Sequence, residues 1–219
     1  MVFKNNPVAA NTPGLAIEER SMAVIEAEVP EPRPFQGREW LIVRRMIHTS
    51  ADFEMLSLVR FSPGAVQSGI SALQSGCLVV TDTEMAKAGI VSRRMEPLGC
   101  EVRCLINDPR VLSQAQSQNT TRAHAAVDLA VSGVRAGIYV VGNAPTALMR
   151  LLELVRAGKA EPRLIIGMPV GFVAAAESKE ALMAQNLVPH ITIKGRKGGS
   201  ALAASVVNAL ADMALNPSQ

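Results

Sequence analysis

Apolar residues in the first third of the chain recur every three or four positions, which is the spacing of one face of an α-helix. In one such segment Trp40, Val43 and Ile47 share a face. Another carries end signals, with Ser62 as a helix N-cap and Gly76 as the stop. The pattern predicts four helices, over residues 17–25, 39–48, 52–59 and 62–76.

After Gly76 the pattern changes to short, continuous apolar runs separated by helical segments. Apolar runs that do not alternate with polar residues are typical of parallel strands covered on both faces. Strands that alternate with helices predict βαβ units with right-handed crossovers. The strands are expected at residues 77–81, 101–106, 137–141, 163–166 and 190–193, and the clearest helices at 121–134, 148–155 and 201–213.

The sequence therefore predicts an α/β fold. We expect a largely parallel sheet of about five strands, flanked by helices and preceded by an N-terminal helical segment. Residues 1–219 are expected to form a single domain, helical over 1–75 and alternating between strand and helix over 76–214. A chain of 219 residues can bury a full core without a disulfide or a metal to hold it together.

Composition and charge exclude several kinds of partner. Aromatic residues make up only 3% of the chain and no long run of Lys and Arg occurs, so we expect no nucleic-acid partner. No stretch reaches the roughly 18 apolar residues that span a bilayer, and the first residues lack the apolar region of a secretory signal, so we expect no membrane partner. The three cysteines have no metal-ligand spacing, which predicts no metal site and fits a cytoplasmic protein.

The segments after the predicted strands hold candidate chemistry, because ligands of open parallel sheets bind beyond the carboxyl ends of the strands. Asn143 can cap the helix that begins near Pro145. The glycines and the serine of 198–200 can present backbone N–H groups to an anion, and Arg196 and Lys197 add full charges. Several such segments at one rim predict a large site for a ligand rich in carboxylates. They span residues 81–83, 142–146, 167–171 and 194–200.

A nucleotide site is a weaker interpretation of the same glycines. Residues 194–200 lack the spacing of a P-loop, and residues 167–171 lack that of a dinucleotide-binding loop. A generic phosphate-binding α/β enzyme therefore stays only as a third possibility, which nucleotide binding would support.

His48 is the most informative titratable residue. It falls at the C-terminal end of a predicted helix, where the helix dipole favours a protonated imidazole. A histidine can serve as a general acid near neutral pH. By local sequence alone, a surface histidine that closes a helix is the more common case.

The motifs together resemble those of the precorrin-8X methylmutase family. Each segment alone is weakly specific, but all of them in this order, from residue 17 to about residue 210, are highly specific. Three features depart from the family pattern: the bulkier and more polar residues 49–52 after His48, which include Asp52, His124 where a small residue is usual, and the charge of Lys197. In chain order the segments are IEERSM (17–22), RMIH (45–48), TDTEM (81–85), NTTR (119–122), GNAPTAL (142–148), GMPVGFV (167–173) and GRKGGS (195–200).

The resemblance implies an isomerase of cobalamin (vitamin B12) biosynthesis. Such an enzyme moves a methyl group from carbon 11 to carbon 12 of precorrin-8X and gives hydrogenobyrinic acid. Related enzymes act on the cobalt-containing equivalent and give cobyrinic acid. The resemblance also implies a homodimer with its site near the interface, a corrinoid (tetrapyrrole) substrate and no separate cofactor. A corrinoid carrier without catalytic activity is the alternative, and it would not need His48.

The resemblance carries His48 over as the proton donor. Of the candidate substrate contacts, Arg122 at a helix start and Arg196 in the glycine loop are the best partners for carboxylates. The candidate substrate contacts are Arg20, Ser21, Thr83, Thr121, Arg122, Asn143 and Arg196.

Overall fold

Six strands form one sheet in the computed structural model of the protein, which describes residues 13–133 and 136–217. The order across the sheet is β1-β6-β5-β4-β2-β3, and every neighbouring pair is parallel except β1 with β6. The largely parallel α/β fold that the sequence predicts is thereby confirmed. The strands are β1 (Val59–Phe61), β2 (Val79–Thr81), β3 (Val102–Cys104), β4 (Ile138–Val141), β5 (Leu164–Gly167) and β6 (His190–Ile193).

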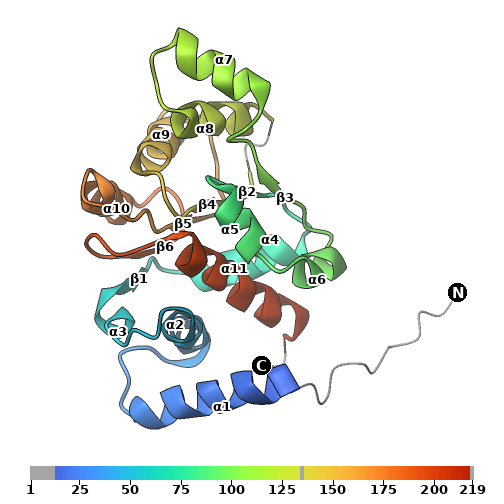
Figure 1. The fold of residues 1–219 in the computed structure, drawn as a ribbon, viewed down its shortest axis with the longest axis vertical. Helices are drawn as coiled ribbons and strands as arrows, with labels where there is room; N and C mark the ends of the chain where they lie inside the picture. The colour runs from blue at the N-terminus through green and yellow to red at the C-terminus, as the bar shows by residue number, and fades with distance from the viewer. Residues whose placement is uncertain (1–12, 134–135, 218–219) are drawn as a thin grey trace, which may run out of the picture.

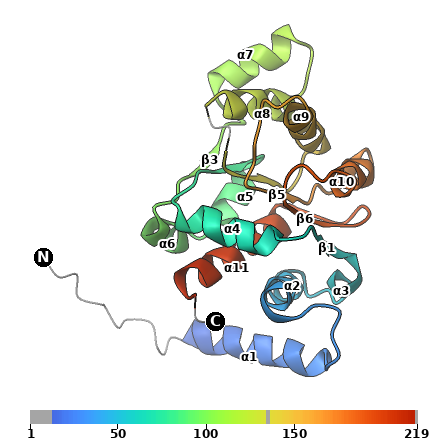
Figure 2. The ribbon, with the colours of Figure 1, turned by 180° about the vertical axis from the view of Figure 1, so that it is seen from behind.

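Helices cover both faces of this sheet, as Figure 1 shows and Figure 2 repeats from behind. The helical elements are α1 (Pro13–Glu28), α2 (Gly37–Ser50), α3 (Met55–Leu58), α4 (Ala65–Gln74), α5 (Glu84–Gly89), α6 (Ser92–Met95), η1 (Glu96–Leu98), α7 (Pro109–Ser117), α8 (Arg122–Gly133), α9 (Pro145–Arg156), α10 (Ala175–Met183) and α11 (Ser200–Leu215). Helices α8, α9 and α10 lie on one face, and α4 and α11 lie on the other. Helix α2 packs on α11, and α1 packs on the outer side of α2.

The helices on the two faces of the sheet explain the apolar runs of the strands. In β4, Ile138 and Val140 point into the core cluster on the α11 side, while Tyr139 and Val141 point into the cluster under α8 and α9. Successive side chains of a strand point to opposite faces, so a sheet covered on both faces needs apolar residues at every position. All four residues of β4 are buried as a result.

Helix α2 is the element that carries His48. Its apolar stripe packs into the core on α11, which leaves the polar side chains of the helix at its margins. The helix ends at Ser50, and Ala51 follows in the left-handed conformation with φ of 50°. This fixed stop places His48 in the last turn. The buried residues of the stripe are Trp40, Ile42, Val43, Met46 and Ile47.

Of the helix predicted over residues 52–59, only residues 55–58 are helical. The segment contains the short helix α3 and then turns into β1, which pairs antiparallel with β6 and aligns Val59 with Ile193. A three-residue strand is too short to show an alternating pattern, and its partner lies far along the chain. The sheet consequently has six strands where about five were expected, and the first third of the chain is not purely helical.

The N-cap predicted at Ser62 is also wrong. Helix α4 begins at Ala65, after Gly64 in the left-handed conformation with φ of 75°. The Ser62 hydroxyl instead accepts the backbone N–H of His190 at 2.7 Å, which ties the start of α4 to β6.

Two predictions concern residues outside the described ranges. One is the last residue of the helix predicted over 121–134, and the other is the start of the chain, where a secretory signal was not expected. Within the described residues, no helix is both long and apolar enough to cross a membrane.

Candidate active site

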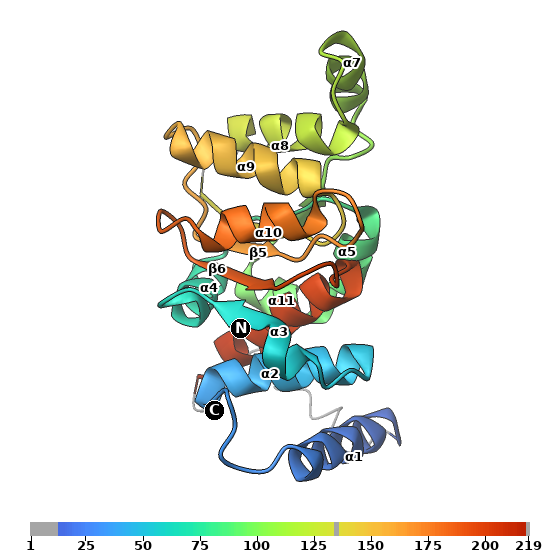
Figure 3. The same ribbon diagram turned by 90° about the vertical axis from the view of Figure 1, so that its left-hand side faces the viewer.

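The loops after β4, β5 and β6 pack against one another at the carboxyl edge of the sheet. At Gly142, a Cβ atom would lie 2.6 Å from Cα of Ser200, and at Gly198 it would lie 2.2 Å from the carbonyl oxygen of Met168. Backbones approach this closely only where glycine removes the side chain. Figure 3 shows the C-terminal end of α2, the N-terminal end of α11 and helix α5 on the same side of the molecule. The segments that the sequence assigned to one rim therefore do meet there.

Asp82 organises the loop after β4. Its carboxylate accepts the backbone N–H groups of Gly142, Asn143 and Ala144 at 2.8–2.9 Å. Burial raises the pKa of the Asp82 carboxyl, against the opposite effect of these three hydrogen bonds. The cap predicted for Asn143 is wrong, because Ala144 is the N-cap residue of α9, no side chain caps that helix, and the Asn143 side chain is exposed.

Two pairs of hydroxyl groups lie along the same edge. The Thr83 hydroxyl accepts the N–H of Ala86 at the start of α5 and lies 2.8 Å from the Ser200 hydroxyl at the start of α11. The Thr121 hydroxyl lies 2.9 Å from that of Thr146. Thr83 and Thr121 thus each join two elements of the rim.

Arg196 projects from the loop after β6. Its side chain is exposed, and its guanidinium lies 5.6 Å from the ring centroid of Phe172 in the loop after β5. The backbone N–H of Gly171 donates to the carbonyl of Arg196 at 3.2 Å. The two loops therefore hold each other, and the charge of Arg196 stays open to a ligand.

His48 contacts one of the predicted substrate-binding residues. Its Nδ1 lies 2.8 Å from the hydroxyl of Ser21 on α1, and none of the described residues hydrogen-bonds its Nε2. When the imidazole is protonated, the Nδ1–H donates to Ser21 and the Nε2–H is left for a ligand. Ser21 thus holds the histidine, a role that the sequence did not assign to it.

A charged network lies beside His48 between α1, α2 and α11. Arg45 pairs with Glu18 of α1 and with Asp212 of α11, and Arg94 also pairs with Asp212. Burial alone would raise the pKa of Glu18, but the hydrogen bond and the charge of Arg45 outweigh it and hold that pKa below its usual range. The positive field of His48 acts in the same direction. Glu18 is not among the residues predicted for the site, although it lies three residues before Ser21 on one face of α1.

Two of the three features that depart from the family pattern meet in space. The ammonium of Lys197 lies 2.6 Å from a carboxylate oxygen of Asp52 and 2.5 Å from one of Glu54. The hydrogen bond from Lys197 holds the pKa of Asp52 below its usual range. This contact ties the glycine loop after β6 to the segment that follows His48, so the histidine and Arg196 belong to one surface.

Arg20 and Arg122 are exposed on α1 and at the start of α8, and no described contact joins either of them to the other predicted site residues. The same holds for the side chain of Asn143.

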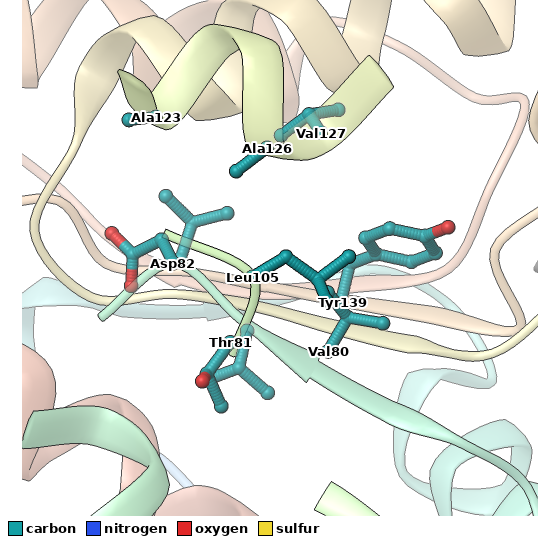
Figure 4. A pocket seen from close by; sticks show the side chains of 10 residues that line it. Val80, Thr81, Asp82, Leu105, Ala123, Ala126, Val127 and Tyr139 are labelled. Carbon is teal, nitrogen blue, oxygen red and sulfur yellow. The ribbon is translucent and has the colours of Figure 1, made fainter. Parts of the chain in front are cut away.

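The pocket in Figure 4 lies between the sheet and α8 and is not this surface. Its walls are mostly Ala, Val and Leu side chains, and the carboxylate of Asp82 at one end already accepts three N–H groups. A multiply charged ligand would find no unpaired cation there. In the described part of the chain, no group of three or more His, Cys, Asp or Glu side chains could hold a metal ion.

The fold is a largely parallel α/β sheet whose rim loops lie beside a histidine at the end of α2. A family model described as precorrin-8X methylmutase matches residues 16–213. The chain belongs to the precorrin-8X methylmutase family, whose members are isomerases of cobalamin biosynthesis.

Relatives with two different names match over most of their length. The cobalt-precorrin-8 methylmutase of Priestia megaterium is 45% identical over 198 residues, which cover 90% of this chain and 87% of that protein. The precorrin-8X methylmutase of a Sinorhizobium species is 42% identical over 199 residues, which cover 90% and 94%. The crystal structure of the precorrin-8x methyl mutase from Thermus thermophilus superposes with a TM-score of 0.86 at 45% identity, over 93% of this chain and 98% of that one.

Proposed function

We propose that this chain shifts a methyl group from carbon 11 to carbon 12 of precorrin-8X, giving hydrogenobyrinic acid, with His48 as the proton donor. The observation that carries the proposal is the setting of His48. Its Nδ1 is held by Ser21, while its Nε2 is left for the ligand beside the basic loops of the rim.

Proton transfer fits an internal methyl shift. Protonation of the macrocycle by Nε2–H of His48 draws electrons from the conjugated ring, and the methyl group migrates with its bonding electrons to the electron-poor carbon. An isomerisation leaves the composition unchanged, so the proton returns to Nε2 after the migration. Ser21 supports both steps, because its hydroxyl keeps accepting the Nδ1–H when Nε2 has lost its proton.

The remaining candidate residues bind and orient the substrate. Precorrin-8X carries acetate and propionate arms, which need cations and hydrogen-bond donors spread over a wide surface. Arg20, Arg122 and Arg196 supply the charges, and Thr83, Thr121 and Asn143 supply polar groups at the rim. Holding the macrocycle in one geometry provides the rest of the rate enhancement.

The cobalt-containing form, cobalt-precorrin-8, is the second candidate substrate. The 45% identical relative from Priestia megaterium carries that name, and the 42% identical relative from Sinorhizobium carries the other. Because these two sequence identities are similar, they do not decide which of the two substrates the chain uses. Turnover of each form by the same preparation decides between them, with the larger kcat/KM marking the natural substrate.

A homodimer completes the proposal, with the site near its interface. Support comes from the loop after β5, where Phe172 and Val173 are 85% and 83% exposed beside Arg196. Exposed apolar side chains next to a ligand site are typical of a surface that a partner covers. A cytoplasmic location stays a prediction from the cysteines alone.

The decisive experiment follows the absorption spectrum of precorrin-8X mixed with the wild-type protein and with His48→Ala. We expect conversion to the product spectrum by the wild type, and a kcat lowered by about 10²- to 10⁴-fold in the variant, because a general acid contributes that much. Binding, followed by the perturbed spectrum of the bound substrate, should persist in both.

Each of the other outcomes has a clear meaning. Equal turnover by both proteins would remove His48 from the mechanism. Substrate that stays bound and unconverted in both samples, in either metal form, would support a corrinoid carrier. A thermal shift produced by nucleotides and not by corrinoids would support the generic phosphate-binding enzyme.

A further inference from the structure

Lys179 is a buried lysine that the proposed mechanism does not use. It lies on α10 with 0% of its surface exposed. Burial lowers the pKa of its ammonium to about 8. No carboxylate of the described residues forms an ion pair with it, and its ammonium donates to the backbone carbonyl of Lys197 at 2.5 Å. Burial of an ammonium without a counter-charge costs free energy, so the one acceptor that Lys179 has in the described structure needs an explanation.

The acceptor belongs to the loop that carries Arg196. This loop is held at successive residues: the Arg196 carbonyl accepts the N–H of Gly171, the Lys197 carbonyl accepts Lys179, and the N–H of Gly199 donates to Met168 at 2.9 Å. All of these contacts come from the loop after β5 or from α10, which follows it.

The other side of the loop is held from α2 and α3. The ammonium of Lys197 pairs with Asp52 and Glu54, which follow His48 in the chain. These groups are partly exposed, so water and salt weaken the ion pair. The Lys179 side chain has no exposed surface, so water weakens its hydrogen bond less than it weakens the ion pair.

We propose that Lys179 is a positioning residue, whose buried ammonium holds the Lys197 carbonyl and so fixes the loop that presents Arg196 to a carboxylate arm of the substrate. The inference rests on the proposed function in one respect, namely that Arg196 binds the substrate. The anchoring of the loop by itself does not depend on it.

The test compares Lys179→Met, which keeps the unbranched apolar stem of the side chain and removes the ammonium donor, with the matched control Ser178→Ala. Ser178 is also fully buried on α10, but its hydroxyl donates to Ala175 within the same helix and does not touch the loop. We expect Lys179→Met to raise KM by about tenfold, as the loss of a hydrogen bond that orients a charged contact does, with kcat within about twofold of the wild type. Ser178→Ala should leave KM unchanged.

A double-mutant cycle with Arg196→Ala separates positioning from a general loss of stability. If Lys179 acts through Arg196, Lys179→Met adds little to the KM of Arg196→Ala. Additive effects, or a fall in kcat with an unchanged KM, would overturn the proposal. Should Lys179→Met fail to fold, Lys179→Gln, which keeps a donor on a shorter arm, is expected to show a smaller rise in KM, and an unchanged KM in that variant counts against the role.

Amide hydrogen exchange tests the anchoring of the loop by Lys179 separately from the proposed function. Faster exchange of the amides at 195–199 in Lys179→Met than in Ser178→Ala supports the anchor even if the wild type converts no corrinoid. Unchanged exchange in that loop refutes the anchor even if the wild type is fully active.

Discussion

His48 owes its setting to residues of another helix. Glu18 and Ser21 of α1 lie three positions apart, and they meet Arg45 and His48 of α2, which are also three positions apart. Residues at this spacing share one face of a helix, so two short contacts align α1 along α2. The histidine thereby receives a hydrogen-bond partner on α1 and lies beside the ion pair of Glu18 with Arg45.

Removal of the Ser21 hydroxyl tests this setting. Ser21→Ala should lower kcat by about three- to tenfold, because one hydrogen bond contributes roughly 1 kcal/mol and the imidazole loses its orientation without it. Steady-state kinetics on precorrin-8X measures the effect. Ser50→Ala is the control, since its hydroxyl donates to Met46 within α2 and does not contact His48. A change in KM alone would show that Ser21 binds substrate instead.

Lys179 gives a second prediction at this scale. Its pKa is lowered from 10.5 to about 8, so between these values the unfolded chain holds a proton that the folded protein lacks. The free energy of unfolding of the wild type should therefore rise with pH relative to Lys179→Met, by roughly 1–3 kcal/mol from pH 8 to pH 10.5. Urea denaturation of both proteins at pH 7.5 and pH 10 measures it. If the free energies of unfolding of the wild type and Lys179→Met differ by the same amount at both pH values, Lys179 keeps its ordinary pKa.

At the scale of elements, glycines decide how closely the rim loops approach one another. Gly142 lets the loop after β4 reach the start of α11, and Asp82 then binds three N–H groups of that loop. One carboxylate thereby fixes both the end of β2 and the start of α9. These contacts place the exposed Asn143 at the rim.

Gly142→Ala should disturb this junction. Its Cβ would meet the backbone of Ser200 at 2.6 Å, so we expect a loss of about 1–3 kcal/mol in the free energy of unfolding together with a higher KM. Chemical denaturation and steady-state kinetics provide the two measurements. In the control Gly133→Ala no atom lies within 4 Å of the new Cβ, and stability should be unchanged or slightly higher. Equal stability of both variants would mean that the loop after β4 moves freely.

At the scale of the whole molecule, the loop after β5 exposes the apolar side chains of Phe172 and Val173, which is unfavourable for a monomer in water. Replacing Phe172 and Val173 together by serine should shift the proposed homodimer toward monomer, because their apolar surface would no longer be buried by the partner. Sedimentation velocity measures the mass of each variant. Leu187→Ser is the control, since Leu187 is 63% exposed in the turn before β6, away from the rim. A wild type that sediments as a monomer at all concentrations contradicts the homodimer.

The sequence by itself determined the fold class, because parallel strands covered on both faces require apolar runs such as those of β4 and β5. It also assigned the rim segments and the position of His48 at a helix end, since these depend on the order of elements along the chain. Edge strand β1 was out of reach, because three residues carry no period and their partner lies in β6. Only the tertiary structure decided that Ser21 holds His48, that Asp82 binds the loop before α9, and that Lys179 reaches the loop of Arg196. Each of these contacts joins residues from different elements, and their distance in space depends on how those elements pack.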